Sequence, residues 1–257
     1  MKKLISVVVP CYNGEQYIEK CLENLLSQSC KSLEIIVIDD GSKDNSAAIA
    51  RRFPVKLISQ ENRGLSAARN AGMDCATGDY IHFFDVDDRI NNTFFENLLA
   101  AIVQTDADIA CSGMINEPAP RKNRIYNKTE LLTDITAKLE KTNVGRWGYV
   151  WRYLFKLDFL KKHALRFEQG RFIEDLPFTL PAVFFAEKLV LVPGAVYFYR
   201  LQQNSIMTNN NFAHRRKRFR DWQHIKKFRK EFANKHNFRI PGVPTVGFKA
   251  LIVKYFG

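Results

Sequence analysis

The chain has 257 residues, of which 46% are hydrophobic, and its formal net charge is +12. This composition excludes a wholly disordered chain and allows one large α/β domain or one domain with a smaller appendage. The apolar run at residues 4–9 is too short for a signal sequence or a membrane span, and no other run reaches about 18 apolar residues, so we expect a cytoplasmic protein whose membrane contact, if any, is peripheral.

The first half of the chain alternates short apolar runs with amphipathic segments. The predicted strands are residues 4–9, 33–38, 55–59, 80–84 and 108–111, and the predicted helices are residues 15–28, 45–53, 65–76 and 92–104. This alternation indicates a mostly parallel, Rossmann-like sheet flanked by helices. Ligands of such sheets bind beyond the carboxyl ends of the strands, so we expect the chemistry in the loops that follow them.

The second half is less regular. Residues 117–127 are predicted to form a loop and residues 129–141 a helix, and a helical stretch at 174–186 leads to a strand at 189–199. Between them lie Trp147, Tyr149 and Trp151, whose rings could stack on sugars, although core packing is the commoner role of such residues.

Three carboxylates follow the predicted strand at residues 80–84. Asp85, Asp87 and Asp88 would repel one another at a strand end unless a cation lay among them, and their hard oxygen ligands suit Mg²⁺ or Mn²⁺. An acidic turn that caps the next helix is the alternative. Asp39 and Asp40 follow another strand, where a carboxylate could bind a nucleobase or ribose, or could belong to an ordinary turn.

The chain contains neither a G-x-G-x-x-G after its first strand nor a G-x-x-x-x-G-K-[ST] motif, which argues against a dinucleotide oxidoreductase and a P-loop enzyme. Instead, its strand-end loops resemble those of the family 2 glycosyltransferases, which have the GT-A fold. The resemblance is strong across residues 3–115 and looser to about residue 208. The matching segments are residues 7–13 (VVVPCYN), 38–42 (IDDGS), 62–70 (NRGLSAARN), 78–81 (GDYI) and 84–88 (FDVDD).

The resemblance implies roles for individual residues. Pro10 and Tyr12 would border the nucleobase of a nucleotide-sugar donor, Asp40 would hydrogen-bond it, and Asn62 and Arg69 would fix the nucleotide. UDP is the nucleotide that the resemblance favours.

Asp85 and Asp87 match the family's D-x-D motif, in which the first carboxylate usually reaches the ribose and the second the metal ion, Mn²⁺ or Mg²⁺. Asp88 is a further candidate metal ligand. Arg200 falls in a segment that resembles one closing over the donor, where it would pair with the diphosphate. A surface arginine is the alternative.

Glu174 and Asp175 resemble the acidic pair that supplies the family's catalytic base, and the resemblance assigns that role to Asp175. An inverting transfer needs a carboxylate near the acceptor hydroxyl, on the face opposite the leaving diphosphate. Two acids favoured by a helix dipole are the alternative. We therefore expect residues 1–115 to bind the nucleotide sugar and residues 116–208 to supply the base and the acceptor site.

Residues 209–257 are predicted to be a basic helical extension. Residues 213–235 contain ten Lys or Arg and two Asp or Glu. Drawn as a helix, they place Trp222, Ile225, Phe228 and Phe232 within an arc of about 120°. Such a helix suits an anionic membrane surface, where a lipid-linked or glycan acceptor would be found. A helix packed on its own domain by the same residues is the alternative.

The sequence thus predicts an inverting, metal-dependent glycosyltransferase that transfers one hexosyl or N-acetylhexosaminyl unit in the synthesis of surface polysaccharide or lipopolysaccharide. A catalytically inactive nucleotide-sugar-binding module is the alternative, and it is disfavoured because the carboxylates and the base are all present. A nucleic-acid-binding protein is disfavoured because no such motif appears and the acidic loops would repel phosphates.

Overall fold

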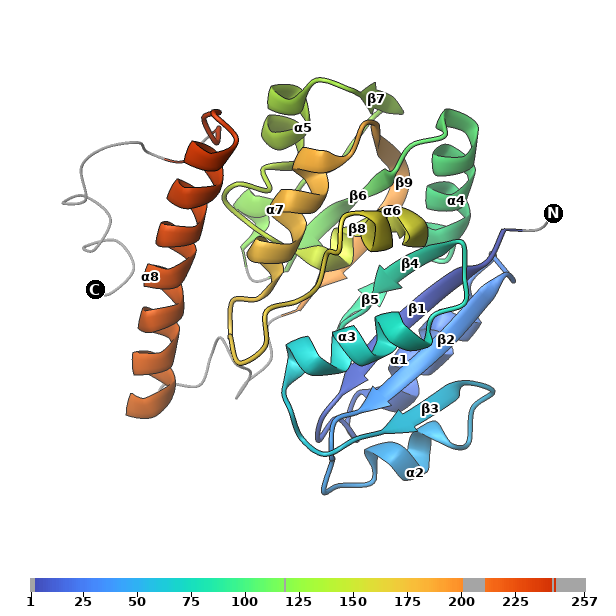
Figure 1. The fold of residues 1–257 in the computed structure, drawn as a ribbon. Helices are drawn as coiled ribbons and strands as arrows, with labels where there is room; N and C mark the ends of the chain where they lie inside the picture. Colours follow the sequence, from blue (N-terminus) through green and yellow to red (C-terminus); the bar gives the residue numbers. More distant parts are fainter. Residues whose placement is uncertain (1–2, 118, 201–210, 242, 244–257) are drawn as a thin grey trace.

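A nine-stranded mixed sheet forms the centre of the fold (Figure 1). The computed structural model describes residues 3–117, 119–200, 211–241 and 243. The strand order is β3-β2-β1-β4-β8-β6-β9-β5, and β7 pairs with β9. The strands are β1 (Ile5–Cys11), β2 (Leu33–Asp39), β3 (Lys56–Ser59), β4 (Tyr80–Phe83), β5 (Arg89–Ile90), β6 (Ile109–Asn116), β7 (Glu130–Leu132), β8 (Tyr153–Lys156) and β9 (Leu189–Tyr199).

The first four strands form the predicted parallel unit. Strand β1 runs parallel to both β2 and β4, and β2 runs parallel to β3. Beyond β4 the sheet is mixed, because β8 is antiparallel to both β4 and β6, whereas β6 and β9 are parallel. The carboxyl ends of β1 to β4 therefore meet at one edge, as expected from the alternation of strands and helices.

Helices cover both faces of the sheet. Alternate residues of each strand point to opposite faces, so Val7 and Val9 join the core beneath α1 and α4, whereas Val8 joins the core beneath α3 and α7. The helices are α1 (Ile18–Leu26), α2 (Ser46–Ala50), α3 (Leu65–Cys75), α4 (Phe94–Thr105), α5 (Ile135–Thr142), α6 (Leu157–Lys162), α7 (Asp175–Phe185) and α8 (Phe212–Lys235), with short 3₁₀ helices at Pro120–Lys122 and Val150–Arg152.

The helix predicted at residues 129–141 is wrong in its first part. Strand β7 pairs antiparallel with β9, and α5 begins only after Asp134. The Asp134 side chain accepts a hydrogen bond from the backbone N–H of Ala137, which is an N-cap that fixes the start of the helix.

The apolar stripe of the predicted basic helix is used for packing within the chain. Ile225 and Phe232 of α8 are buried, and the Phe232 ring lies 5.3 Å from that of Phe184 on α7. Within the part of the chain that the structure describes, none of the helices combines the length and the hydropathy that a bilayer span requires. The predicted boundary at residues 208 and 209 lies outside the described residues.

Helix α3 approaches β1 closely at Gly72. A Cβ atom added there would collide with the side chain of Val8. We predict that Gly72→Ala destabilises the protein by about 1 to 2 kcal/mol, because an overpacking cost of about 1–3 kcal/mol exceeds the gain of about 1 kcal/mol in helix propensity. Urea unfolding measures this change, and adding Val8→Ala to Gly72→Ala should recover part of the loss. A more stable Gly72→Ala variant would contradict this packing.

Candidate functional site

The loops after the first two strands are held together by hydrogen bonds. The backbone N–H of Asn13 donates to the Ser42 hydroxyl at 3.0 Å, and the backbone N–H of Lys43 donates to the Asn13 side chain at 2.8 Å. Glu15 adds a further link, because its carboxylate accepts from the backbone N–H of Asn45 at 3.0 Å. The predicted meeting of strand-end loops is therefore confirmed for these two segments.

Asp40 joins the second loop to the third. Its carboxylate accepts hydrogen bonds from the Gln60 side chain at 2.7 Å and from the backbone N–H groups of Arg63 and Gly64 at 2.9 and 2.8 Å. The side chain is buried. Its three hydrogen bonds show that Asp40 shapes the loop before α3, and the nucleobase contact implied by the resemblance stays a prediction.

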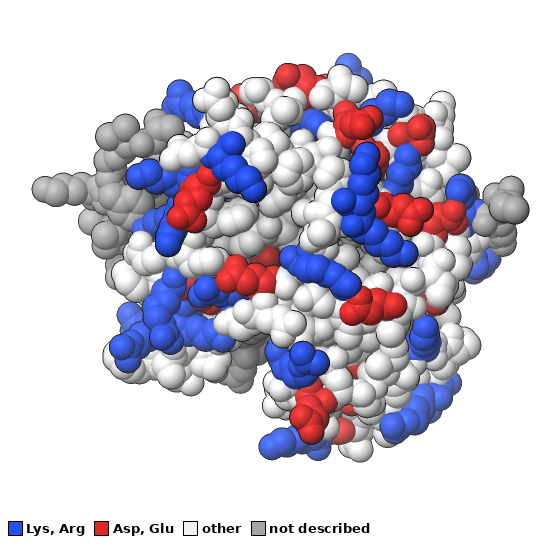
Figure 2. All heavy atoms as spheres, viewed as in Figure 1, with Lys and Arg blue, Asp and Glu red and all other residues white. Residues whose placement is uncertain are grey.

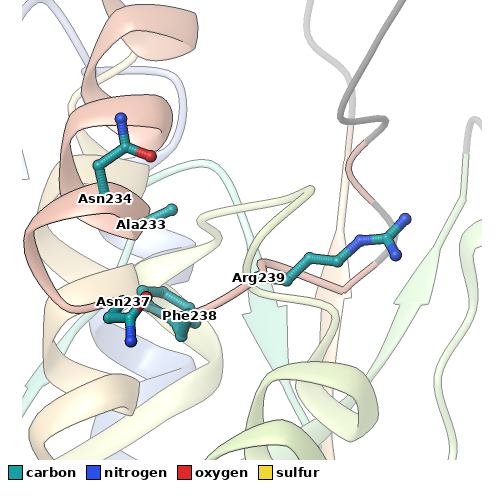
Figure 3. Close-up of a pocket in the computed structure, with 5 residues that line it drawn as sticks. All are labelled: Ala233, Asn234, Asn237, Phe238 and Arg239. Carbon is teal, nitrogen blue, oxygen red and sulfur yellow. The ribbon is translucent and has the colours of Figure 1, made fainter.

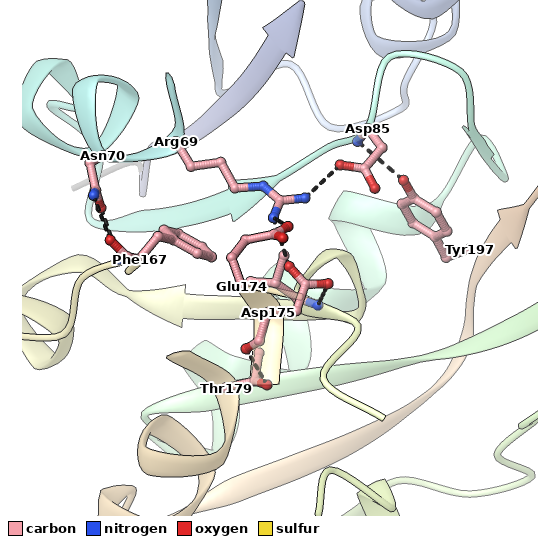
Figure 4. Close-up of polar contacts among 9 residues, drawn as sticks. Arg69, Asn70, Asp85, Phe167, Glu174, Asp175, Thr179 and Tyr197 are labelled. Carbon is pink, nitrogen blue, oxygen red and sulfur yellow. Dashed lines mark hydrogen bonds and ion pairs between the residues drawn. The ribbon is translucent and has the colours of Figure 1, made fainter. Parts of the chain in front are cut away.

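Arg69 on α3 is the centre of a buried ion network (Figure 4). Its side chain is 1% exposed, and its guanidinium contacts carboxylate oxygens of Asp85 at 2.8 Å, Glu174 at 2.7 Å and Asp175 at 2.6 Å. The Phe167 ring lies 5.3 Å from the same guanidinium. The structure thus assigns Arg69 a role that differs from the predicted nucleotide contact: it brings the D-x-D loop and the candidate base together.

The pKa values in this network follow from burial and an excess of negative charge. Burial lowers the pKa of Arg69, but the three nearby carboxylates together raise it above its usual value. Burial and the neighbouring Asp175 raise the pKa of Glu174 to about 8. Burial and the charge of Asp85 raise the pKa of Asp87 to about 6. Arg69 therefore does not neutralise the cluster, and a further cation would be favourable there.

Asp87 and Asp88 differ in their surroundings. Asp88 is buried, and one of its oxygens accepts the backbone N–H of Arg200 at 2.9 Å. Its other oxygen is buried without a hydrogen-bond partner in the described residues. The Asp87 carboxylate is half-buried, and no side chain of the described residues forms an ion pair with it. Asp87 is therefore free to face a ligand, whereas Asp88 points towards the end of β9.

The donor set fits a hard divalent cation only in part. Within the described ranges, no three His, Cys, Asp or Glu side chains converge to hold a metal ion. Mg²⁺ is commonly held by one or two carboxylates together with substrate phosphates. The half-buried carboxylate of Asp87 and the raised pKa of that group fit such a shared site.

The loop before the 3₁₀ helix at Val150–Arg152 borders the candidate base. The backbone N–H of Val150 faces an oxygen of Asp175 at 3.3 Å, and a Cβ atom on Gly148 would lie 2.7 Å from the Cβ of Asp175. Tyr149 has a φ of 37°, in the left-handed region that is costly for an aromatic residue. Trp147 stacks on Tyr149 and both are partly exposed, whereas Trp151 is buried against Tyr197. Core packing therefore describes Trp151, and Tyr149 stacks on it at the margin of the core, with the ring centroids 5.0 Å apart.

Helix α8 holds the segment that leads to the acidic pair. Buried Asp221 accepts the backbone N–H of Phe172 at 2.7 Å and contacts the guanidinium of Arg171 at 3.3 Å. Glu168 accepts from Arg171 at 2.9 Å and lies 2.6 Å from the His224 ring. Sequence reasoning missed this contact, although an isolated acid in a strongly basic helix was a signal for it.

The remaining predicted donor residues lie around the same edge of the sheet. Pro10 is buried in β1, Tyr12 is 49% exposed just beyond it, and Asn62 is exposed in the loop after β3. The Arg200 guanidinium pairs with Glu117 at 3.2 Å, so its predicted contact with the diphosphate would require that pair to open. Residues 201–210, which follow it, lie outside the described residues.

A cavity of about 390 Å³ lies away from this edge, at the C-terminal end of α8 (Figure 3). It contains neither a carboxylate nor a nucleophilic side chain among its lining residues, which are Ala233, Asn234, Asn237, Phe238 and Arg239. The acidic cluster around Arg69 is therefore the better candidate for chemistry.

Comparison with known proteins is consistent with this geometry. Among solved structures, the fold is similar to that of TarS from S. aureus in complex with UDP-GlcNAc, with a TM-score of 0.72 and 22% sequence identity. The match covers 91% of this chain and 72% of the TarS chain. It is also similar to the mannosyltransferase PcManGT from Pyrobaculum calidifontis in complex with GDP-Man and Mn²⁺, with a TM-score of 0.59 at 18% identity, over 80% of this chain and 59% of that one. These likenesses establish the GT-A fold.

The sequence comparisons establish the family. The uncharacterized glycosyltransferase EpsJ of Bacillus subtilis is 35% identical over 222 residues, which are 80% of this chain and 63% of EpsJ. The chain therefore spans less than two thirds of that relative. The family model for glycosyl transferase family 2 matches residues 6–169. With more than half of its length matched, the chain belongs to glycosyl transferase family 2.

Proposed function

We propose that this protein is an inverting glycosyltransferase that moves a sugar from a nucleotide diphosphate donor, with UDP as the favoured nucleotide, to a hydroxyl group. One observation carries the proposal: Arg69 contacts Asp85 of the D-x-D loop at 2.8 Å and Asp175 at 2.6 Å. A donor held beside the first carboxylate and an acceptor hydroxyl beside the second would lie within one reaction centre.

Asp175 is the proposed base. Arg69 contacts one of its oxygens, and the backbone N–H of Val150 faces the other at 3.3 Å. Each carboxylate oxygen has two lone pairs, so the second oxygen can still accept a proton. Glu174 is almost completely buried, so it suits the support of Arg69 rather than contact with an acceptor.

The proposed reaction is a single displacement. The acceptor oxygen bonds to the anomeric carbon while the bond between that carbon and the donor phosphate oxygen breaks, and the hydroxyl proton moves to Asp175. The nucleoside diphosphate leaves with the bonding electron pair, and the anomeric configuration inverts. Holding the reactants in line and removing the proton are the parts that this chain's residues would supply.

Asp87 would hold Mn²⁺ or Mg²⁺, with Asp85 and Asp88 close by. When bound, such an ion supplies positive charge that stabilises the leaving diphosphate. Asp85 would orient the donor, and the ion pair that it makes with Arg69 supports this role. The Mn²⁺ in the PcManGT complex supports this proposal by similarity of fold alone.

The proposed acceptor is a glycan or lipid-linked hydroxyl, and the proposed pathway is the synthesis of surface polysaccharide or lipopolysaccharide. The partly exposed rings of Trp147 and Tyr149 lie beside the backbone that contacts Asp175, where they suit the apolar face of an acceptor sugar. A hexosyl or N-acetylhexosaminyl unit is the proposed transferred group, as in the UDP-GlcNAc complex of TarS.

The nucleotide can be identified by thermal stability. We expect a UDP-sugar with Mn²⁺ at about one hundred times its Kd to raise the melting temperature by about 5–10 °C, because a ligand that binds only the folded state stabilises it by about 2.7 kcal/mol. GDP- and dTDP-sugars at equal concentration are the comparison. Stabilisation by none of these donors would contradict nucleotide-sugar binding.

Replacing the proposed base should separate catalysis from binding. We predict that Asp175→Asn lowers kcat by about 10²-fold or more while the Kd of the donor changes little, because the amide cannot accept the acceptor proton. Asp158→Asn, on the exposed surface of α6, is the matched control and should keep its kcat. An unchanged kcat in Asp175→Asn would assign the base to another residue.

Asp87→Asn should lose activity and gain stability. Without metal, the folded protein keeps the Asp87 proton up to about pH 6, whereas the unfolded chain releases it near pH 3.8. As the pH rises from about 3.8 to about 6, the free energy of unfolding therefore falls by about 3 kcal/mol, because the folded protein binds the proton more tightly than the unfolded chain does. The amide of the Asp87→Asn variant does not titrate, so this variant does not lose that stability.

The measurement is urea unfolding in chelator from pH 4 to pH 7.5, with Asp158→Asn as the control for a lost surface charge. The stability of Asp87→Asn relative to the natural chain should rise across this range, while Mn²⁺-dependent turnover disappears. Full turnover in Asp87→Asn would remove this residue from the metal site, and a flat stability difference would contradict its raised pKa.

A further inference from the structure

Helix α8 uses one of its faces for contacts within the chain. Asp221, Ile225, Phe228 and Phe232 follow one another at spacings of four, three and four residues, so they lie on the same side of the helix. Asp221 and Ile225 are buried, and Phe228 and Phe232 pack in the core that includes α7. Three of the four residues of the stripe that the sequence suggested for a membrane are thus covered within the chain, and the fourth, Trp222, is 37% exposed.

The surface of α8 beside and opposite this covered face carries exposed aromatic residues. Phe212, Phe219 and Trp222 are 81%, 56% and 37% exposed. At 3.6 residues per turn, Phe219 follows Phe212 by two turns, and Trp222 follows Phe219 on an adjacent line of the helix. We call this side the outer face of α8. Exposing three large rings on one helix face is costly in water, so it indicates a surface that another partner covers.

Basic side chains surround these rings. Figure 2 shows Lys and Arg gathered at the end of the molecule where α8 begins. The exposed acid of the helix, Glu231, lies 3.7 Å from Lys227, and the exposed basic residues of α8 outnumber it. These basic residues are Arg215, Arg216, Arg220, Lys227, Lys230 and Lys235.

We infer that the outer face of α8 binds the surface of a bilayer that contains anionic lipids. Aromatic rings enter the boundary between headgroups and acyl chains, while Arg and Lys beside them contact the lipid phosphates. The exposed rings all lie in the first half of α8, so this half of the helix would lie along the surface, with the exposed cations of the same helix beside it. This inference concerns where the protein binds, and it does not depend on which reaction the Arg69 cluster performs.

A lipid surface fits this face better than a nucleic acid does. Proteins that bind single strands use a positively charged groove with rings inside it. The outer face of α8 is instead the convex side of a single helix that stands at the edge of the molecule (Figure 1). A flat, extended anionic surface can contact all of it at once, whereas a strand would contact a narrow line.

Vesicle sedimentation tests the inference with the full chain. The natural protein should bind vesicles of phosphatidylglycerol and phosphatidylcholine at least tenfold more tightly than vesicles of phosphatidylcholine alone, and binding should weaken as NaCl rises from about 0.05 to 0.5 M. The triple variant Arg216→Gln, Phe219→Ser and Arg220→Gln should lose tenfold or more of that binding, with its melting temperature unchanged.

The matched control is the triple variant Lys161→Gln, Lys162→Gln and Val103→Ser, which removes the same charge and one exposed apolar side chain elsewhere on the surface. Its affinity for the anionic vesicles should change by less than twofold. An equal loss in both variants, or no preference for anionic vesicles, would overturn the inference. Binding to single-stranded DNA without vesicle binding would also overturn it. Donor binding is measured separately by thermal shift, so failure here leaves the proposed transfer reaction untouched.

Discussion

The ion network around Arg69 is the constraint on which the site depends. A guanidinium that is 1% exposed must be paired, because an isolated buried charge is very costly. Its partners come from two distant parts of the chain: Asp85 follows β4, and Glu174 and Asp175 begin α7. Removing Arg69 would leave buried carboxylates unpaired, at a cost of about 3–5 kcal/mol. Packing these two parts of the chain against each other and assembling the candidate site are therefore one event.

The same network leaves the site with more negative charge than its single cation balances. Because of burial and of this excess of negative charge, the pKa values of Asp87 and Glu174 are raised, so the folded protein retains protons on these groups at a higher pH than usual. In the proposed function, a divalent cation would take the place of the proton on Asp87. The raised pKa of Asp87 therefore makes its charged form unfavourable for the stability of the protein without metal, as is common at functional sites.

Sequence reasoning predicted the edge of the sheet well because parallel strands bring their following loops together whatever the loops contain. Thus Asn13 and Ser42, 29 residues apart, are in contact as that rule requires. It did not predict that Arg69 would reach Glu174 across 105 residues, because local pattern carries no information about such pairs. Nor did it show that Asp40 would use its oxygens on the neighbouring loop, since a buried and an exposed carboxylate look alike in sequence.

Helix α8 shows why an apolar stripe alone does not identify a binding face. The helical period groups Ile225 and Phe232 whether they meet a bilayer or α7, and only the fold decides between the two. Asp221 is buried, unlike Glu231, the other acid of this helix, and it accepts the backbone N–H of Phe172, two residues before Glu174. One side of α8 thus fixes the approach to the acidic pair, and the other presents rings and cations outward. A membrane surface bound to the outer face of α8 would consequently hold the candidate site at a fixed distance from the membrane and in a fixed orientation.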